Sequence, residues 1–291
     1  MLRFIAYEGG RLVLGLVGAA ILAAAVASAG HLRDGVFPFF VAWGERIGAF
    51  AALRFGDCAI SGSPILTELS NRLPVTGELV VQGAVAALLI GVPVGFAFAF
   101  DGARRVAALL VRLFSAVPTF CLALALSYLA TNQLHWHAQH DAEGWLYAPR
   151  FLLQPGGALL PVLTIGLAGA AAIQAALRRV AENIAEAPWR NQMRRMGLSR
   201  WEIEWNLCLP LFLGALLAHL GELAVALLSA TAVAEWVFSL PGAADLFVKS
   251  IALQDWSAAG AVLFVFAGLT LAAAFAGRCT AQPLTSPFSL S

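Results

Sequence analysis

The sequence predicts an all-α, polytopic membrane protein with about six transmembrane helices. Hydrophobic residues make up 60% of the 291 residues and charged residues only 12%, whereas about a quarter of an ordinary soluble domain is charged. Apolar runs of about 20 residues follow one another along the chain, and a helix needs about that length to cross the hydrocarbon layer. These observations exclude a soluble globular protein and favour a single transmembrane domain over residues 1–291.

Charged, Pro or Gly-rich residues bound each of the six apolar runs. The runs are Leu12–Ala29, Glu78–Phe100, Val106–Leu129, Leu159–Leu177, Leu211–Val233 and Ala258–Ala276. The first follows Arg3 and Arg11 and contains Ala-x-Ala patterns like those of a signal peptide, but it is longer than the apolar core of a typical signal. We therefore expect a retained first helix over residues 11–29.

The segments between and after the spans have different predicted roles. Residues 30–77 are expected to form an outer loop, in which the apolar patch Val36 to Trp43 is too short to span and lies on or near the bilayer. A turn at residues 61–64 then precedes an amphipathic stretch that leads to Pro74. A five-helix core follows over residues 78–278, and residues 279–291 form a tail.

The distribution of positive charge predicts the orientation. In the six-span arrangement, twelve of the 18 Lys and Arg residues fall on the side of the N-terminus and six on the other side. Because Lys and Arg accumulate in cytoplasmic loops, both termini and the tail are expected in the cytoplasm. The arginines are scattered between apolar runs and form no basic face with interleaved aromatics, so no nucleic-acid partner is expected.

The segment 178–210 is long, charged and helical in pattern, although it lies between two apolar spans. Gly197 interrupts the helical pattern, and Ser199 is placed to cap a second short helix. Glu202 follows three residues later, at the position that completes a capping box. The segment therefore predicts a helix, a glycine-centred turn and a short helix, which together form an elbow that projects into the cytoplasm.

The elbow resembles a signature of the permeases of binding-protein-dependent ABC importers. That signature reads E-A-A, three residues, Gly, nine residues, then I-x-L-P. Here Gly197 is followed at the same spacing by Leu207-Cys208-Leu209-Pro210, with Leu in place of Ile, and Asn191-Gln192-Met193 stands where the family has E-A-A. The chain is identified on this pattern as a member of that family.

Other segments resemble the dipeptide, oligopeptide and nickel branch, in its first-permease type with a long outer loop. They are Arg54-Phe55-Gly56-Asp57, Arg72-Leu73-Pro74, Val117-Pro118-Thr119-Phe120 and Glu235-Trp236-Val237-Phe238-Ser239-Leu240-Pro241-Gly242. The matches run in order from about Arg54 to Gly260, whereas the first fifty residues share only the plan of the branch. A peptide is accordingly the expected cargo, with nickel chelates or another small solute as the alternative.

The resemblance implies a type I ABC importer permease fold, located in the inner membrane, with a cytoplasmic coupling helix. It also implies three kinds of protein partner: a second homologous permease, two ATPase subunits and an extracytoplasmic binding protein. The chain is further expected to contact the lipid bilayer. The residues expected to couple to the ATPase are Asn191, Arg194, Arg195, Met196, Gly197, Leu198, Leu207, Leu209 and Pro210. The chain has no G-x-x-x-x-G-K-[ST] motif, so ATP and Mg are expected on the ATPase subunits and no cofactor on this chain.

Polar residues in the fifth span predict a substrate path. An acid within a membrane helix usually faces a cavity or a partner, and Glu222 lies near the middle of this span, one turn after His219. The two side chains either line the path or hydrogen-bond each other or a helix of a partner subunit. Ser229 and Glu235 extend the predicted path. Glu78, Glu235 and Asp255 are expected at outer membrane edges, either at a handover point or as solvated charges.

Three histidines, His135, His137 and His140, follow the third span. They are weak candidates for metal ligands, because imidazole suits nickel and zinc, and a solvated loop is the more frequent explanation of such a cluster. A secondary transporter or channel is the alternative from another class, although we find no internal repeat. A membrane enzyme is disfavoured because neither G-x-S-x-G nor H-E-x-x-H occurs.

Overall fold

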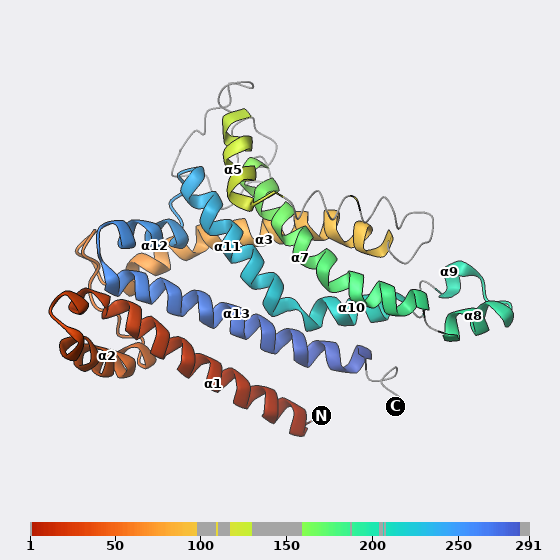
Figure 1. The fold of residues 1–291 in the computed structure, drawn as a ribbon, viewed down its shortest axis with the longest axis horizontal. Coiled ribbons are helices and arrows are strands. Elements are labelled where there is room, and N and C mark those ends of the chain that lie inside the picture. Colours follow the sequence, from red (N-terminus) through yellow and green to blue (C-terminus); the bar gives the residue numbers. More distant parts are fainter. Residues whose placement is uncertain are drawn as a thin grey trace.

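The computed structural model describes residues 2–97, 109, 117–129, 159–186, 188–203, 206 and 208–285, and the regular elements of this part of the chain are helices (Figure 1). In chain order these are α1 (Leu2–Ala27), the 3-10 helix η1 (Ala29–Arg33), α2 (Val36–Ala51), α3 (Ile65–Ala97), α5 (Thr119–Tyr128), α7 (Leu159–Glu186), α8 (Pro188–Arg195), α9 (Arg200–Ile203), α10 (Leu209–Ala218), α11 (Leu220–Val237), α12 (Ala243–Ala252) and α13 (Trp256–Thr285).

Within the described part, five helices are long and apolar enough to cross a membrane. They are Phe4–Ala27, Ile65–Val94, Leu159–Arg178, Leu220–Val237 and Trp256–Gln282. Two shorter apolar helices, Thr119–Tyr128 and Leu209–Ala218, accompany them. The all-α polytopic prediction is therefore confirmed, and the first part of the predicted third span, Val106–Leu129, lies outside the described residues.

The first two spans begin earlier than predicted. Helix α1 starts at Leu2 rather than near Leu12, because Glu8 is buried between two arginines and its charge does not end the helix. Helix α3 starts at Ile65 rather than at Glu78. Its first turns are amphipathic and carry a Glu68–Arg72 pair at 2.7 Å, which stabilises the helix outside the apolar region. Residues 30–77 are thus largely helical, not a plain loop.

The predicted fifth span, Leu211–Val233, is divided in two. Helix α10 ends and α11 begins at His219, where φ is −99° and ψ is 14°. The carbonyl of Ala215 accepts the backbone N–H of His219 at 3.1 Å and lies 2.9 Å from its ring Nδ1. Next to the break, a Cβ at Gly221 would crowd Ala274 of α13. The break therefore permits close contact between this helix pair and α13.

Small residues form the seam between α3 and α7, which make the most extensive helix pair in the described part. A side chain at Gly83 would clash with Ile165, and one at Gly166 would clash with Ala86. Glycine and alanine let two membrane helices approach closely, so that van der Waals contact replaces the hydrophobic effect as the main attraction. The seam continues to Leu227 of α11 through Gly169, which joins three spans in one core.

Helices α1 and α13 lie side by side and are tied together at both ends. At one end, Arg278 of α13 donates to the buried Glu8 of α1 at 2.5 Å. At the other end, α2 lies across α1, where Trp43 Nε1 donates to the carbonyl of Ile21 at 2.9 Å. Arg46 donates to the carbonyl of Ala27 and, at 3.0 Å, to Ser257 Oγ at the start of α13.

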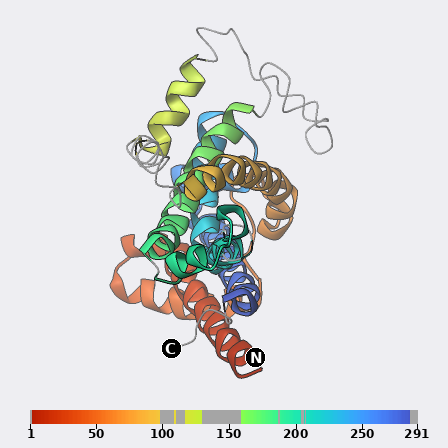
Figure 2. The same ribbon diagram turned by 90° about the vertical axis from the view of Figure 1, so that its right-hand side faces the viewer.

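The two ends of the bundle differ in what they carry. Figure 1 shows α8 and α9 at the same end as the start of α1 and the end of α13, whereas α2 and α12 lie at the opposite end. Figure 2 confirms that α5 leans away from the bundle on the side opposite α1. The elbow and the described ends of the chain therefore lie at the same end of the bundle.

The Glu8–Arg278 contact gives a testable expectation for stability. Arg278→Gln removes the charge that joins α1 to α13, and we expect a loss of about 1–3 kcal/mol, since a buried carboxylate loses a partner. Arg11→Gln is the matched control: Arg11 also pairs with Glu8, at 3.1 Å, but it lies on the same helix and is half exposed, so its loss costs under about 1 kcal/mol. Thermal unfolding in detergent measures both; equal shifts would contradict the assignment.

Candidate functional site

The elbow has the local structure that its sequence predicts. Helix α8 ends at Arg195, the chain turns at Gly197 with φ +89°, and α9 begins after Ser199. Glu202 Oε2 accepts the backbone N–H of Ser199 at 2.7 Å, and Ser199 Oγ accepts the backbone N–H of Glu202 at 3.2 Å. The predicted capping box is confirmed. A positive φ is costly for residues with a Cβ, so glycine is the residue that this turn requires.

The tip of the elbow presents apolar side chains between charged ones. Met196 is 77% exposed, and Leu198, Arg194 and Arg195 are exposed beside it. Asn191 lies in α8, Leu209 and Pro210 lie in the first turn of α10, and Leu207 and the side chain of Asn191 lie outside the described residues. Of the residues predicted to couple to an ATPase, the described ones thus fall into an exposed tip and a helix start behind it.

The capping box makes the elbow sensitive to acid. The hydrogen bond from the Ser199 backbone, followed by that from its hydroxyl, lowers the pKa of Glu202 below its ordinary value. A carboxylate with a lowered pKa contributes stability above the pKa of the unfolded chain, and this contribution is lost as the pH falls through the lowered value. The cap of α9 is therefore complete at neutral pH.

Glu235 has a structural role that the sequence did not predict. Its side chain is fully buried. Oε1 accepts the hydroxyl of Thr76 at 2.6 Å, and Oε2 accepts the backbone N–H of Asp245 at 2.9 Å. Thr76 Oγ1 in turn accepts the backbone N–H of Ala243 at 2.8 Å. Glu235 and Thr76 together cap the N-terminus of α12, whose first amides have no partners within their own helix.

Asp255 is likewise a cap rather than a solvated edge charge. It is 7% exposed. Its carboxylate accepts the backbone N–H of Ala258, in the first turn of α13, at 3.1 Å and that of Ala59 at 2.7 Å. The second bond fixes the segment before α3 against the start of α13. The partners Thr76 of Glu235 and Ala59 of Asp255 are distant in sequence, so the sequence did not indicate these two bonds.

One signal in the sequence pointed to the cap at Glu235. Gly242 precedes α12, and a Cβ there would occupy the position of the Glu235 carboxylate. A glycine just before a short amphipathic helix, seven residues after a buried acid, indicates that a side chain must approach the backbone closely. Near this cap, Asp245 accepts Arg72 at 3.3 Å and Lys249 at 2.6 Å, which joins α3 and α12 through charge as well.

Glu222 and Ser229 share an exposed face of α11. Val225 lies between them on the same face. Glu222 and Val225 border a hollow of about 280 Å³ between α11 and α13, and Val225 and Ser229 border a second one of about 270 Å³. The two hollows share Val225 and Thr270. They form one groove along α11, polar at the end near Arg278 and apolar at the other.

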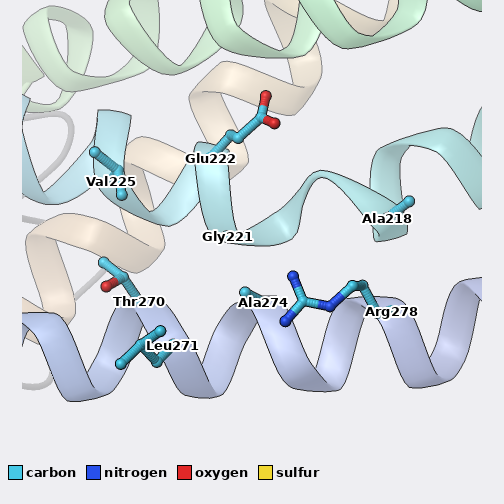
Figure 3. Close-up of a pocket in the computed structure, with 8 residues that line it drawn as sticks. All are labelled: Ala218, Gly221, Glu222, Val225, Thr270, Leu271, Ala274 and Arg278. Carbon is cyan, nitrogen blue, oxygen red and sulfur yellow. The ribbon is translucent and has the colours of Figure 1, made fainter. Parts of the chain in front are cut away.

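His219 and Glu222 do not bond to each other, so this part of the structural interpretation is wrong, whereas a bond to a helix of a partner subunit stays a prediction. The ring of His219 lies against the carbonyl of Ala215, one turn back in α10. Figure 3 shows the Glu222 carboxylate directed away from α13 and the guanidinium of Arg278 lying along α13. No described residue forms an ion pair with Glu222, so this exposed acid borders the hollow with its carboxylate turned away from α13.

No group of three or more metal-ligating side chains occurs among the residues that the structure describes. The weak metal candidates, His135, His137 and His140, lie outside that part of the chain. The described site therefore consists of the elbow, the buried caps and the α11–α13 groove.

Thr76→Val tests the capping arrangement. The variant keeps the side-chain shape and leaves the Ala243 amide and one Glu235 oxygen without a partner, so we expect a loss of about 1–3 kcal/mol. Thr164→Val is the control, because Thr164 is also buried but donates only to the carbonyl of Leu160 in its own helix. Unfolding in detergent measures the stability of both variants, and an equal loss of stability in the two would rule out a special role for Thr76.

Comparison with known proteins identifies the family to which the chain is similar. The model of the family described as "binding-protein-dependent transport system inner membrane component" matches residues 80–279. The putrescine export system permease protein SapB of Escherichia coli K12 is 26% identical over 246 residues, which cover 75% of each chain. The dipeptide transport system permease protein DppB of Lactococcus lactis is 27% identical over 223 residues, 74% of this chain and 69% of the relative.

A third relative is the glutathione transport system permease protein GsiC of Salmonella choleraesuis, 25% identical over 215 residues, 73% of this chain and 67% of the relative. The family match spans more than half of the chain, includes the elbow, and agrees with the multi-pass helical structure. The chain therefore belongs to the inner-membrane components of binding-protein-dependent transport systems and is a permease subunit of an ABC transporter.

Proposed function

We propose that this permease forms half of the pore through which a peptide or peptide-like solute passes from a binding protein into the cytoplasm. The exposed elbow around Gly197 carries the proposal, because a structural connection between two spans needs no capped, protruding helix pair. Relatives named for dipeptide, glutathione and peptide transport support this class of cargo. A second homologous permease would complete the pore.

The elbow is proposed to dock on an ATPase subunit. Met196 supplies an exposed apolar contact and Arg194 and Arg195 supply flanking charges, a combination typical of a protein interface, where apolar anchors are surrounded by a polar rim. ATP and Mg would bind to two such ATPase subunits and not to this chain. The elbow and the N-terminus lie at the same end of the bundle, which supports cytoplasmic termini.

The groove along α11 is the proposed substrate path of this subunit. An unpaired acid within the membrane costs about 2.5–3.5 kcal/mol on the insertion scale and is expected to face water or a partner. Glu222, with Ser229 farther along the same exposed face, meets this expectation. Glu235 does not, because both of its carboxylate oxygens accept hydrogen bonds in the cap of α12. A solute with a positively charged group is the cargo that Glu222 favours.

Gly197→Val tests the elbow. The branched side chain cannot adopt φ +89° without strain, so the elbow changes shape, and we expect uptake of the dipeptide Ala-Phe by the reconstituted transporter to fall at least tenfold while ATP hydrolysis continues. Gly77→Val is a control, since a Cβ there meets nothing within 4 Å and its φ is ordinary. Normal uptake by Gly197→Val would overturn the coupling role.

Glu222→Gln tests the path. We expect a several-fold lower maximal rate of Ala-Phe uptake in proteoliposomes, with the stability of the permease unchanged, because the acid has no partner among the described residues whose loss would matter. His219→Gln is the comparison: His219 lies against a backbone carbonyl of its own helix and should affect stability more than rate. Unchanged rate and affinity in Glu222→Gln would remove Glu222 from the path.

A further inference from the structure

The apolar end of the α11–α13 groove is a hollow of about 270 Å³ with walls from three helices. Most of its lining is aliphatic or aromatic. Leu228 comes from α11, Phe247 from α12, and Leu263 and Phe266 from α13. Covering open apolar surface of this kind with an apolar group is favourable. The hollow therefore favours an apolar occupant.

Polar groups lie where this hollow meets the one that Glu222 borders. Val225 and Thr270 line both hollows. The hydroxyl of Thr270 donates to the carbonyl of Ala267 at 2.8 Å, within its own helix, whereas Ser229 lines the apolar hollow and is exposed. An occupant of the whole groove must therefore combine an apolar group with a polar one. Hydrocarbon tails alone do not, and a carboxylate beside such tails is costly.

The wall that α12 contributes is held in place by the cap at the start of this helix. The backbone N–H groups of Ala243 and Asp245 donate to the capping side chains at 2.8 and 2.9 Å. Ala244, between them, and Phe247, one turn later, line the hollow. A preformed wall spares a ligand the entropic cost of ordering it. The hollow can therefore select its occupant by size.

The volume of the hollow suits one side chain. An apolar cavity of about 150 Å³ can hold a benzene molecule, whereas sites for whole small molecules usually measure about 300–1,000 Å³. We propose that this hollow is a subsite for one apolar side chain, preferably aromatic, of the transported solute. That the side chain belongs to the cargo rests on the proposed function, whereas binding of a phenyl group in the hollow does not.

The first experiment uses Ser229→Cys in the assembled transporter in proteoliposomes. The accessible native thiols, Cys121 and Cys279, are first replaced by serine. A cationic methanethiosulfonate reagent, which needs water at the thiol, should modify position 229, with or without ATP. Millimolar 2-phenylethanol should slow the modification at least threefold, and ethanol should not. No modification in either condition would overturn the proposal, because a lipid or a partner subunit would then fill the hollow.

The matched control narrows the hollow in the same background. Ala267 lines the hollow, whereas Ala272 lies on the same helix, is exposed and does not line it. Ala267→Leu should abolish the protection by 2-phenylethanol, and Ala272→Leu should leave it intact. Protection that persists in Ala267→Leu would overturn the proposal, because the alcohol would then act through the bilayer or at another position.

Uptake of Ala-Phe and Ala-Ala from a mixture tests selection in the native-cysteine transporter. The binding protein is the same in all variants, so its own preference cancels when their Ala-Phe to Ala-Ala ratios of kcat/KM are compared. Ala267→Leu should lower this ratio about tenfold, mainly through a higher KM for Ala-Phe, since small changes in an apolar pocket have effects of this size. Ala272→Leu should not change it.

Phe247→Ala enlarges the hollow and should shift preference from Ala-Phe toward Ala-Trp, which a folding defect cannot do. Unchanged ratios in both Ala267→Leu and Phe247→Ala would overturn the subsite. Absence of uptake of all three dipeptides by the wild-type transporter would instead refute the peptide cargo, while the protection of position 229 would still report on the hollow.

Discussion

The end of this permease that carries α12 depends on one requirement, that the backbone amides at the start of a helix find acceptors within the protein. The first amides of α12 have no partners within their own helix. Glu235 and Thr76 supply the acceptors, from α11 and α3. Because one carboxylate and one hydroxyl join three helices, the positions of α3, α11 and α12 are set together. Asp255 does the same for α13 and the segment before α3.

A second constraint is the absence of a hydrophobic driving force between helices inside lipid. The glycine and alanine residues between α3 and α7 hold these two helices together by close contact. The Glu8–Arg278 ion pair holds α1 to α13. The caps and the seam act on the same helices. Helix α3 is held by its small residues along α7 and, through Thr76, by the cap of α12.

The features that could be predicted from the sequence are those whose causes are local. The capping box at Ser199 and Glu202 involves residues three apart, and the turn at Gly197 depends on one backbone conformation. The exposure of Glu222 followed from the cost of a charge in an apolar span. Glu235 could not be placed in this way, because its burial depends on Thr76, 159 residues away. The break at His219 was missed since the residues on both sides are apolar and favour a continuous helix.

Because of these constraints, α10 and α11 are held in place by different contacts. The end of α11 that carries Glu235 is fixed by the cap of α12, whereas α10 follows the elbow after a short connection and packs on α7 and α13. His219 separates the two helices, and its backbone is already outside the helical region. Along the chain, His219 therefore lies between the elbow and the cap. The change of direction between α10 and α11 lies beside Gly221 and Glu222, which border the hollow between α11 and α13. A change of angle between α10 and α11 at this break would need no regular helix to be broken, whereas the end of α11 at Glu235 is held by hydrogen bonds to α3 and α12.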